Sequence, residues 1–471
     1  MKKRVALIWP RGLEPAYALP LPYASIVANT PAELCEFRLF DLALDQRSPE
    51  EFGREIAEFK PDIIGVTSYG MNFRQALAAA RAAKAAAPAA VVVSGGPHAS
   101  AWARGVLKHP EIDFVLKGEA DLAFGDFVKE LSAPSPDWTN VPGLARREGG
   151  KVSEAPAAVV ENLDSLALPD YRFIRLDEYL RRGYRLFSDG RPVAPIQTTR
   201  GCPGTCAFCG VAAVNGRRVR RFSTAYSMRW IEALHVEFGI QWFNIIDDNF
   251  TNEPEHARAF CEAALRLDIP GLRFGTPNGI RMQRGDAGLW RLMKKAGWEH
   301  LVVAPESGSA KVLGLMDKGL APAEMAPIIR DIRAAGLRLR GFFIIGYPGE
   351  TRADLAETLA LIKCGGFDYT ELLFFQPIPG TAAFQKLVAE GEIGEDFLPS
   401  SFSFGERAYV SKELADVNFP LLFFRVKLGE AFRNPRNLLR LIRRTSPWAT
   451  ARKLAGLFFN MLRHRKARGS I

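Results

Sequence analysis

The sequence is poor in cysteine and contains no long hydrophobic run. Six cysteines in 471 residues are too few for a disulfide framework. No segment reaches the roughly 18 consecutive apolar residues of a transmembrane helix. Only five apolar residues precede Pro10, which is too short for the core of a secretory signal and indicates a first β-strand. We therefore expect a cytoplasmic protein, at most peripheral to the inner face of the membrane.

A dinucleotide-binding signature is also missing. No G-x-G-x-x-G follows the first predicted strand, where the chain reads Pro10-Arg11-Gly12-Leu13. The length allows two or three domains. The apolar content of 48% and the charged content of 24% are ordinary for a globular protein.

Charge is unevenly distributed along the chain. Residues 425–471 contain 13 lysines and arginines and one acidic residue, Glu430, which gives this segment a net charge of +12. The whole chain carries +10, so residues 1–424 sum to −2. The high isoelectric point therefore belongs to the C-terminal segment.

Apolar residues in this basic segment repeat with helical spacing, at Leu454, Leu457, Phe458, Met461 and Leu462. A basic amphipathic helix is typical of a segment that lies on an anionic membrane surface. A helix packed on the protein body with a solvated basic face explains the same pattern. Nucleic acid is not expected as a partner, because no RNA-binding module accompanies the charge.

Residues 1–132 alternate short apolar strands with helical stretches. Strands are predicted at 4–9, 34–40, 62–67, 90–94 and 113–116, and helices near 20–30, 50–59, 72–86, 100–108 and 121–131. Continuous apolar strands separated by helices indicate a doubly wound, parallel, Rossmann-like sheet. Residues 133–190 are predicted to be a linker with a small hairpin at 143–147 and 151–153.

A second series of strands and helices is predicted over residues 191–400. Its strands are expected at 194–198, 241–246, 272–276, 300–304, 338–345 and 368–375. Six parallel βα units indicate a partial TIM-type barrel, whose chemistry lies at the C-terminal ends of the strands. Residues 401–471 are predicted to form a basic helical region.

Three cysteines follow the first strand of this barrel in a C-x3-C-x2-C pattern, at Cys202, Cys206 and Cys209. Three thiolates can hold three irons of a 4Fe–4S cube and leave the fourth iron open to a small molecule, whereas an electron-transfer cluster normally has four cysteines. A structural zinc site is disfavoured because it needs a fourth ligand, and the nearest histidine in sequence is His235.

The cysteine spacing, with Phe208 just before the last cysteine, resembles the signature of the radical S-adenosylmethionine (radical-SAM) enzymes. The resemblance implies that the open iron chelates the methionine moiety of S-adenosylmethionine. An electron from the cluster then cleaves the sulfonium to a 5′-deoxyadenosyl radical. An electron donor such as flavodoxin or ferredoxin is expected as a partner.

Further residues at the barrel strand ends match this family. Asp247 and Asp248 end the second strand, where paired acids are well placed to bind a cation, and the resemblance makes that cation the α-amino group of the cofactor. Glu306 and Ser307 follow the fourth strand, although Ala304-Pro305 departs from the Gly-aliphatic pair common there. Gly346 follows the fifth strand, on the adenine side.

The loops that follow the strands of the first domain are rich in glycine, at 68–72, 94–99 and 117–121. They resemble the cobalamin-binding domain that precedes many radical-SAM barrels. The resemblance implies cobalamin contacts from Ser68, Gly95, Gly96, His98, Gly118 and Glu119. The Asp-x-His-x-x-Gly motif of other cobalamin proteins is absent, so no histidine from it lies beneath cobalt, and His98 is expected to be a turn residue.

The resemblance implies a cobalamin-dependent enzyme that methylates an unactivated carbon of a lipid-like or secondary-metabolite substrate. One alternative is a radical cyclase or rearrangement enzyme of tetrapyrrole type, without net methyl transfer. A third is a non-catalytic redox sensor, which would not need binding turns at several strand ends. The residues offer no strong general acid or base, and no catalytic side chain is assigned.

Overall fold

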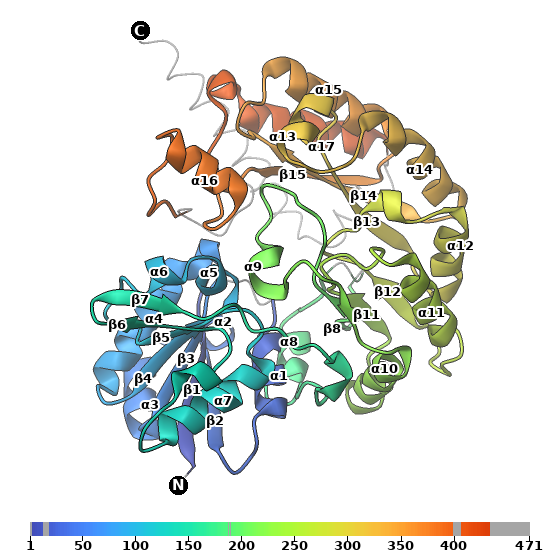
Figure 1. Ribbon diagram of the computed structural model, residues 1–471. Helices are drawn as coiled ribbons and strands as arrows, with labels where there is room; N and C mark the ends of the chain where they lie inside the picture. Colours follow the sequence, from blue (N-terminus) through green and yellow to red (C-terminus); the bar gives the residue numbers. More distant parts are fainter. Residues whose placement is uncertain (1, 13–17, 187, 189, 399–406, 434–471) are drawn as a thin grey trace.

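The structure, a computed structural model, describes residues 2–12, 18–186, 188, 190–398 and 407–433. Two α/β units lie against each other (Figure 1). The first carries the N-terminal sheet, and the second carries the barrel strands. The predicted architecture, a parallel sheet followed by a partial barrel, is confirmed.

The first sheet has the strand order β2-β1-β3-β4-β5-β6-β7. Its parallel strands are β1 (Lys3–Trp9), β2 (Cys35–Asp41), β3 (Ile63–Thr67), β4 (Val91–Gly95) and β5 (Phe114–Leu116). Strands β1, β3, β4 and β5 are largely buried because helices cover both faces, whereas the edge strand β2 has exposed residues. The strand order reverses between β1 and β3, and the Tyr23 hydroxyl bridges the two there, donating to Ile8 O and accepting from Thr67 N. Such a switch point is where sheets of this kind bind ligands.

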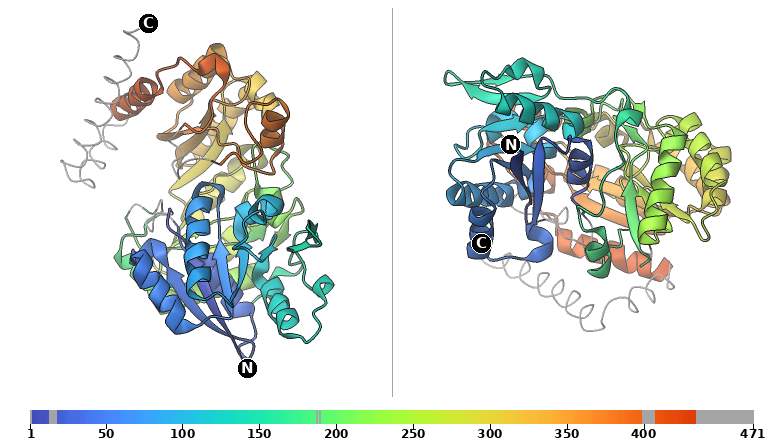
Figure 2. Two further views of the ribbon diagram at one scale, coloured as in Figure 1. Left: turned by 90° about the vertical axis from the view of Figure 1, so that its left-hand side faces the viewer. Right: turned by 90° about the horizontal axis from the view of Figure 1, so that it is seen from below.

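The covering helices are α1 (Leu21–Asn29), α2 (Leu42–Asp45), α3 (Pro49–Phe59), α4 (Phe73–Ala86), α5 (Gly96–Ala101), α6 (Ala103–Val106) and α7 (Ala120–Ser132). Helices α3 and α4 pack on one face of the sheet. Helices α1 and α7 pack on the other, and their core continues into the barrel. Figure 2 shows α1 between the first sheet and the barrel.

Helix α5 begins earlier than the helix predicted near 100–108. Its first residues are Gly96, Pro97 and His98, it ends at Ala101, and Trp102 separates it from α6. Proline is favoured in the first turn of a helix, because its fixed φ suits the helix and its missing N–H would be unpaired there anyway. The Gly-Pro-His turn is therefore the start of a helix.

The hairpin expected within the linker belongs to the first sheet. Strand β6 (Leu144–Glu148) pairs antiparallel with β5 and with β7 (Lys151–Glu154). At least this part of residues 133–190 therefore extends the first sheet. The remaining segment contains α8 (Leu176–Arg181) and leads into the barrel.

The second unit has six parallel barrel strands, β8 (Val193–Ile196), β11 (Trp242–Ile245), β12 (Arg273–Gly275), β13 (His300–Glu306), β14 (Arg338–Ile345) and β15 (Tyr369–Phe374). They form two ladders, β8-β11-β12 and β13-β14-β15, and single bridges such as Ile280–Val303 join these. The helices around them are α10 (Thr224–Phe238), α11 (Pro254–Ala264), α12 (Ala287–Ala296), α13 (Ala310–Leu315), α14 (Pro322–Ala334), α15 (Arg352–Cys364) and α16 (Ala382–Ala389). The result is an open, partial barrel (Figure 1).

Shorter elements complete the described chain. The cysteine loop lies between β9 (Thr199–Arg200) and β10 (Arg220–Arg221), and it contains α9 (Val211–Asn215). The 3-10 helices are η1 (Gly70–Asn72), η2 (Trp138–Asn140), η3 (Leu163–Ser165), η4 (Met282–Arg284) and η5 (Lys412–Leu414).

Helix α17 (Phe419–Arg433) packs against the edge strand β15. Glu430 accepts a hydrogen bond from Thr370 N at 2.7 Å, and the Phe374 ring contacts those of Phe419 and Phe423. The start of the basic segment therefore packs on the barrel. The apolar stripe predicted at 454–462 lies outside the described residues. None of the described helices is long and apolar enough to cross a membrane.

Candidate active site

The cysteine loop leaves the barrel after β8 and is closed at its base by pairing of β9 with β10. Cys202 N donates to Gly216 O across the loop at 3.3 Å. Cys202 and Cys206 are half-buried, and Cys209 is exposed. Among the described residues, no three His, Cys, Asp or Glu side chains are placed to hold a single metal ion. The donor set suited to a cluster is the three thiols of this loop.

Two cations lie beside Cys206. An Arg281 nitrogen is 3.9 Å from Cys206 Sγ, and the same nitrogen donates to Lys318 O. Burial raises the pKa of the Cys206 thiol, while the positive charges of Lys318 and Arg281 lower it. A Cβ added at Gly204 would lie only 3.1 Å from Arg281 Nη1, so the loop folds closely around this guanidinium. Thiols surrounded by fixed positive charge suit a thiolate-bound cluster.

Glu306 forms a buried ion pair with Lys318 at 2.7 Å. Its φ of +66° lies in the left-handed region, which costs a residue other than glycine free energy, and β13 is irregular at this point. The Lys318 ammonium lies 5.9 Å from the centre of the Phe208 ring. The predicted residues Glu306 and Phe208 are thus brought together through Lys318.

The two acids at the end of β11 have different surroundings. Both oxygens of the buried Asp247 accept hydrogen bonds, from Thr198 N, Thr198 Oγ1 and Thr199 Oγ1 at 2.6–2.8 Å. Burial raises its pKa to about 6 against these bonds. Asp248 is less buried, and its Oδ2 accepts from Gly201 N at 2.9 Å and Asn215 Nδ2 at 2.8 Å. Asp247 therefore fixes the end of β8, and Asp248 holds both ends of the cysteine loop.

Ser307 and Gly346 make contacts within the protein. The Ser307 hydroxyl lies 2.9 Å from Thr358 Oγ1 on α15. Gly346 has a φ of +76°, and a Cβ there would lie 2.7 Å from Val410 Cγ2. Glu350 accepts from Gly346 N at 2.5 Å, and Ser411 N donates to Gly346 O. These residues hold the turns after β13 and β14 in place.

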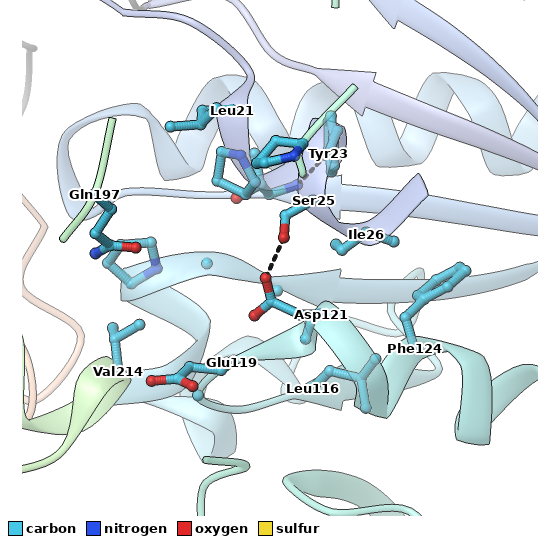
Figure 3. A pocket seen from close by; sticks show the side chains of 18 of the residues that line it. Leu21, Tyr23, Ser25, Ile26, Leu116, Glu119, Asp121, Phe124, Gln197 and Val214 are labelled. Carbon is cyan, nitrogen blue, oxygen red and sulfur yellow. Dashed lines mark hydrogen bonds between the residues drawn. The ribbon is translucent and has the colours of Figure 1, made fainter. Parts of the chain in front are cut away.

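A cavity of about 340 Å³ lies between the first sheet and the barrel (Figure 3). Its walls are mainly apolar and include Leu7, Val93, Leu116 and Phe124. Polar side chains reach the cavity from both units. They include Gln197, Arg200 and Asn215 from the barrel unit, and Glu119 and Asp121 from the start of α7 in the first unit. An apolar cavity with a few placed polar groups is typical of a cofactor site.

The predicted cobalamin contacts fall into two groups. Gly95, Gly96, Gly118 and Glu119 line the cavity, whereas Ser68 and His98 are not among its lining residues. The Ser68 hydroxyl is buried without a partner among the described residues. A Cβ at Gly96 would lie 2.4 Å from Thr67 Oγ1, and one at Gly118 would lie 2.3 Å from Ala158 O. Close packing of the chain on itself therefore demands these two glycines.

His98 lies in an aromatic surrounding at the start of α5. Its ring centre is 4.4 Å from that of Phe73 and 5.6 Å from that of Trp102. Neither ring nitrogen has a hydrogen-bond partner among the described residues. Burial, helped by the charge of His109, lowers its pKa to about 4, so the ring is neutral. The geometry gives His98 a packing role.

Sequence reasoning missed four arginines and lysines of this region. Arg281 and Lys318 lie beside Cys206, while Arg200 and Arg220 form buried ion pairs with Glu119 and Asp121. Arg200 sits directly before the cysteine loop, which could have drawn attention to it. Nothing in the sequence singles out the other three, because only the fold brings them to the site.

Comparison with known families agrees with this two-part site. Residues 21–128 match the B12 binding domain, and residues 196–362 match the Radical SAM superfamily. The first match covers the unit with the glycine turns. The second begins at the last residue of β8 and contains the cysteine loop.

Individual proteins resemble the chain over most of its length. It is 29% identical over 365 residues to an uncharacterized methyltransferase of Pyrococcus horikoshii, covering 77% of both chains. It is 28% identical to the anaerobic magnesium-protoporphyrin IX monomethyl ester cyclase of Cereibacter sphaeroides, covering 76% of this chain and 58% of the cyclase.

The fold is also similar to that of a solved structure. The radical S-adenosylmethionine methyltransferase TsrM of Kitasatospora setae, with cobalamin and a [4Fe-4S] cluster bound, superposes with a TM-score of 0.73. The superposition covers 90% of this chain and 91% of TsrM at 17% identity, which shows a shared fold. The chain combines a B12-binding domain, a radical-SAM barrel and a three-cysteine loop whose ends line the cavity. It therefore belongs to the B12-binding radical SAM enzyme family, whose cofactors are a 4Fe–4S cluster, S-adenosylmethionine and cobalamin.

Proposed function

We propose that this enzyme transfers a methyl group to an unactivated carbon of a lipid-like or secondary-metabolite substrate. The observation that carries the proposal is the position of the cavity next to the cysteine loop. Arg200 and Asn215, which lie on either side of the three cysteines in the chain, line the cavity. A methyl donor held in the cavity and a radical initiator held at the loop would thus face one substrate space. The name of the Pyrococcus relative supports methyl transfer.

The cysteine loop would hold the cluster through Cys202, Cys206 and Cys209. Arg281 and Lys318 place positive charge next to Cys206, and that charge would stabilise the thiolates. Phe208, beside Lys318, would cover one side of the cluster. When bound, the reduced cluster supplies the electron that cleaves S-adenosylmethionine, and cobalamin supplies the methyl group.

Three residues are proposed to orient S-adenosylmethionine. Asp248 is better placed than Asp247 to meet its α-amino group, because both Asp247 oxygens are already engaged. Glu306 would contact the ribose or methionine part from its strained turn. Gly346 would let the backbone approach the adenine. Ser307 would act indirectly, by fixing the Glu306 turn against α15.

In the first domain, the cavity would hold the nucleotide side of cobalamin. Gly95, Gly96 and Gly118 line it, and the apolar walls would exclude water from the bound group. Because His98 is packed against Phe73 and is not on the cavity wall, we propose that His98 is not a ligand of cobalt.

A cyclase of tetrapyrrole type is the second candidate. It is supported by the similarity to the magnesium-protoporphyrin cyclase, although the match covers only 58% of that protein. Family membership places the chain among enzymes rather than redox sensors. Such enzymes need a substrate and a reductant, for which we propose a flavodoxin or ferredoxin.

The two candidates differ in their products. We would incubate the anaerobically reconstituted enzyme with methyl-labelled S-adenosylmethionine and with candidate lipids and tetrapyrroles. Methyl transfer should yield labelled product, S-adenosylhomocysteine and 5′-deoxyadenosine. Turnover that forms 5′-deoxyadenosine and an unlabelled, altered product would instead establish cyclisation or rearrangement.

A further inference from the structure

Four charged side chains form a buried ion network where the first sheet meets the barrel. Glu119 and Asp121 lie at the start of α7, and Arg200 and Arg220 lie on β9 and β10. Their side chains are only 2% (Glu119), 3% (Arg220), 8% (Asp121) and 11% (Arg200) exposed. Every ion pair in this network joins the first domain to the barrel.

The network is connected rather than made of separate pairs. Arg200 binds both oxygens of Asp121, at 2.7 and 3.1 Å, and lies 3.3 Å from Glu119. Arg220 binds both oxygens of Glu119, one of them at 2.8 Å. Burial alone would raise the pKa of Asp121, but Arg200 and the Ser25 hydroxyl together bring it below its usual value. Asp121 is therefore ionised at neutral pH, although it is buried.

Buried charges of this kind bring little net stability, because the free energy of desolvating them roughly offsets their attraction. Removing one partner alone is costly, because it leaves an uncompensated buried charge. Since every pair crosses between the domains, an arrangement of the domains that separates the pairs carries this cost, and the network restricts how the domains are placed.

What the network positions is the cysteine loop. Arg200 is two residues before Cys202, and Arg220 also donates to the backbone carbonyl of Asn215, at the end of α9. Asn215 in turn donates to Asp248, which binds Gly201 N. Both ends of the loop are thus tied to α7 through hydrogen bonds and ion pairs.

The same residues form the wall of the cavity. Glu119, Asp121, Arg200 and Asn215 all line it, and Asp121 accepts a hydrogen bond from Ser25 on the cavity side of α1 (Figure 3). A ligand that fills the cavity therefore contacts groups that hold the loop. A change of loop position would equally move part of the cavity wall.

We propose that this network couples the two cofactor sites, so that cobalamin in the cavity and the cluster in the cysteine loop each strengthen binding of the other. The inference rests on the proposed placement of cobalamin in the cavity. Coupling between two sites is reciprocal, so it can be measured from either side. Arg200 and Arg220 act here as positioning residues.

The test measures the dissociation constant of hydroxocobalamin by titration calorimetry, for protein with and without a reconstituted cluster. We expect cluster-loaded wild-type protein to bind at least about fivefold more tightly, the lower end of typical coupling. In the double variant Glu119→Gln/Arg220→Gln, which removes both charges together, the ratio should fall to within twofold of one. Circular dichroism and iron content would show that the variant folds and takes up iron.

A matched control removes an ion pair that stays within the first domain. Lys84 and Asp113 pair at 3.1 Å, so Lys84→Met/Asp113→Asn should keep the wild-type ratio. Arg200→Lys is a milder second variant, which retains the charge but loses the two-pronged bond to Asp121, and it should give an intermediate ratio.

Three results would overturn the inference. A wild-type ratio near one would show that the sites are independent while leaving the proposed function intact. An unchanged ratio in both Glu119→Gln/Arg220→Gln and Arg200→Lys would show that the network does not carry the coupling. Absence of cobalamin binding to cluster-loaded wild-type protein would remove the inference and the proposed cavity site together.

Discussion

Arg281 shows how one side chain can tune the site without holding a ligand. Its guanidinium lies 3.9 Å from Cys206 Sγ and is held by the Lys318 carbonyl. A fixed positive charge next to a cluster favours its reduced form, because reduction adds negative charge. The positive charge of Arg281 should therefore make it easier for a weak reductant to reduce the cluster.

Replacing Arg281 by Gln should lower the reduction potential of the cluster by on the order of 50–100 mV, the size expected for one partly screened charge a few ångströms away. Potentiometric titration followed by electron paramagnetic resonance would measure it. Arg284→Gln is the control, because Arg284 is exposed at the end of the short helix η4, which begins directly after Arg281. Equal potentials for both variants and the wild type would show that Arg281 only packs.

Cys206→Ala should prevent cluster assembly, because the two remaining thiolates would bind only two of the four irons of the cube. We expect loss of the iron–sulfur absorbance and a fall in 5′-deoxyadenosine formation to background. Cys364→Ala is the control, since Cys364 is exposed at the end of α15 and outside the loop. Continued cleavage of S-adenosylmethionine by Cys206→Ala would contradict the ligand assignment.

Glu350 should make stability depend on pH. Burial raises its pKa to about 7, against the hydrogen bonds from Gly346 N and Tyr347 N. The folded protein therefore holds this proton more tightly than the unfolded chain. The stabilisation is complete below the unfolded pKa of roughly 4.5 and is lost as the pH rises through about 7.

Between pH 5 and pH 8, the wild type should lose about 2–3 kcal/mol of stability relative to Glu350→Gln, which cannot titrate. Thermal unfolding of both proteins across this range would measure the difference. Glu357→Gln, which replaces an exposed carboxylate on the helix α15 that follows Glu350, should follow the wild type. A parallel pH dependence of wild type and Glu350→Gln would contradict the prediction.

At the scale of elements, the turn after β4 shows where the glycines are needed. Gly96 has a φ of +89°, and a Cβ there would meet both Thr67 Oγ1 and the Ser68 backbone. Alanine would thus push α5 away from the β3 turn and alter the cavity rim. Gly150 also has a positive φ, of +78°, but nothing lies within 4 Å of its Cβ position.

Gly96→Ala should therefore weaken hydroxocobalamin binding at least tenfold, about 1.4 kcal/mol, and lower the unfolding midpoint by more than Gly150→Ala. The strain of a left-handed alanine, roughly 1–2 kcal/mol, is common to both variants, so their difference isolates the steric clash. Calorimetry and thermal unfolding would provide the two readouts. If both variants have the same hydroxocobalamin affinity and the same unfolding midpoint, the turn after β3 can move aside with no loss of binding or stability.

Helices and strands could be predicted from the sequence where the pattern of apolar residues matches the pattern of buried residues. The barrel strands β8 and β11 are buried at every position, and strands buried on both faces need nearly continuous apolar residues. Strands β14 and β15 alternate buried and half-buried residues instead. Side-chain roles were less predictable. The sequence shows that Asp247 and Asp248 are adjacent, but it cannot show that Thr198 and Thr199 already occupy the first of them. Lys318 lies 112 residues beyond Cys206, and no local pattern links the two.

At the scale of the whole molecule, the two domains share one apolar core and a buried ion network, so they are placed firmly against each other. The body defined by residues 1–424 is nearly neutral, and the positive charge gathers in 425–471. Helix α17 begins this segment and lies at the barrel end of the molecule, opposite the N-terminus (Figure 2). The Phe432 side chain of this helix is 79% exposed and lies within the basic segment.

The basic segment 425–471 should bind anionic membranes. This expected membrane binding is also what supports a lipid-like substrate. Each lysine or arginine near such a surface contributes about 1 kcal/mol. Full-length protein should therefore sediment with vesicles rich in phosphatidylserine, and binding should weaken as salt rises, because exposed charges are screened beyond roughly 8 Å at physiological ionic strength. Deleting residues 447–471 should release the protein while S-adenosylmethionine cleavage continues. If full-length and truncated proteins sediment equally, or if neither does, the tail has a structural role and the lipid-like substrate loses its support.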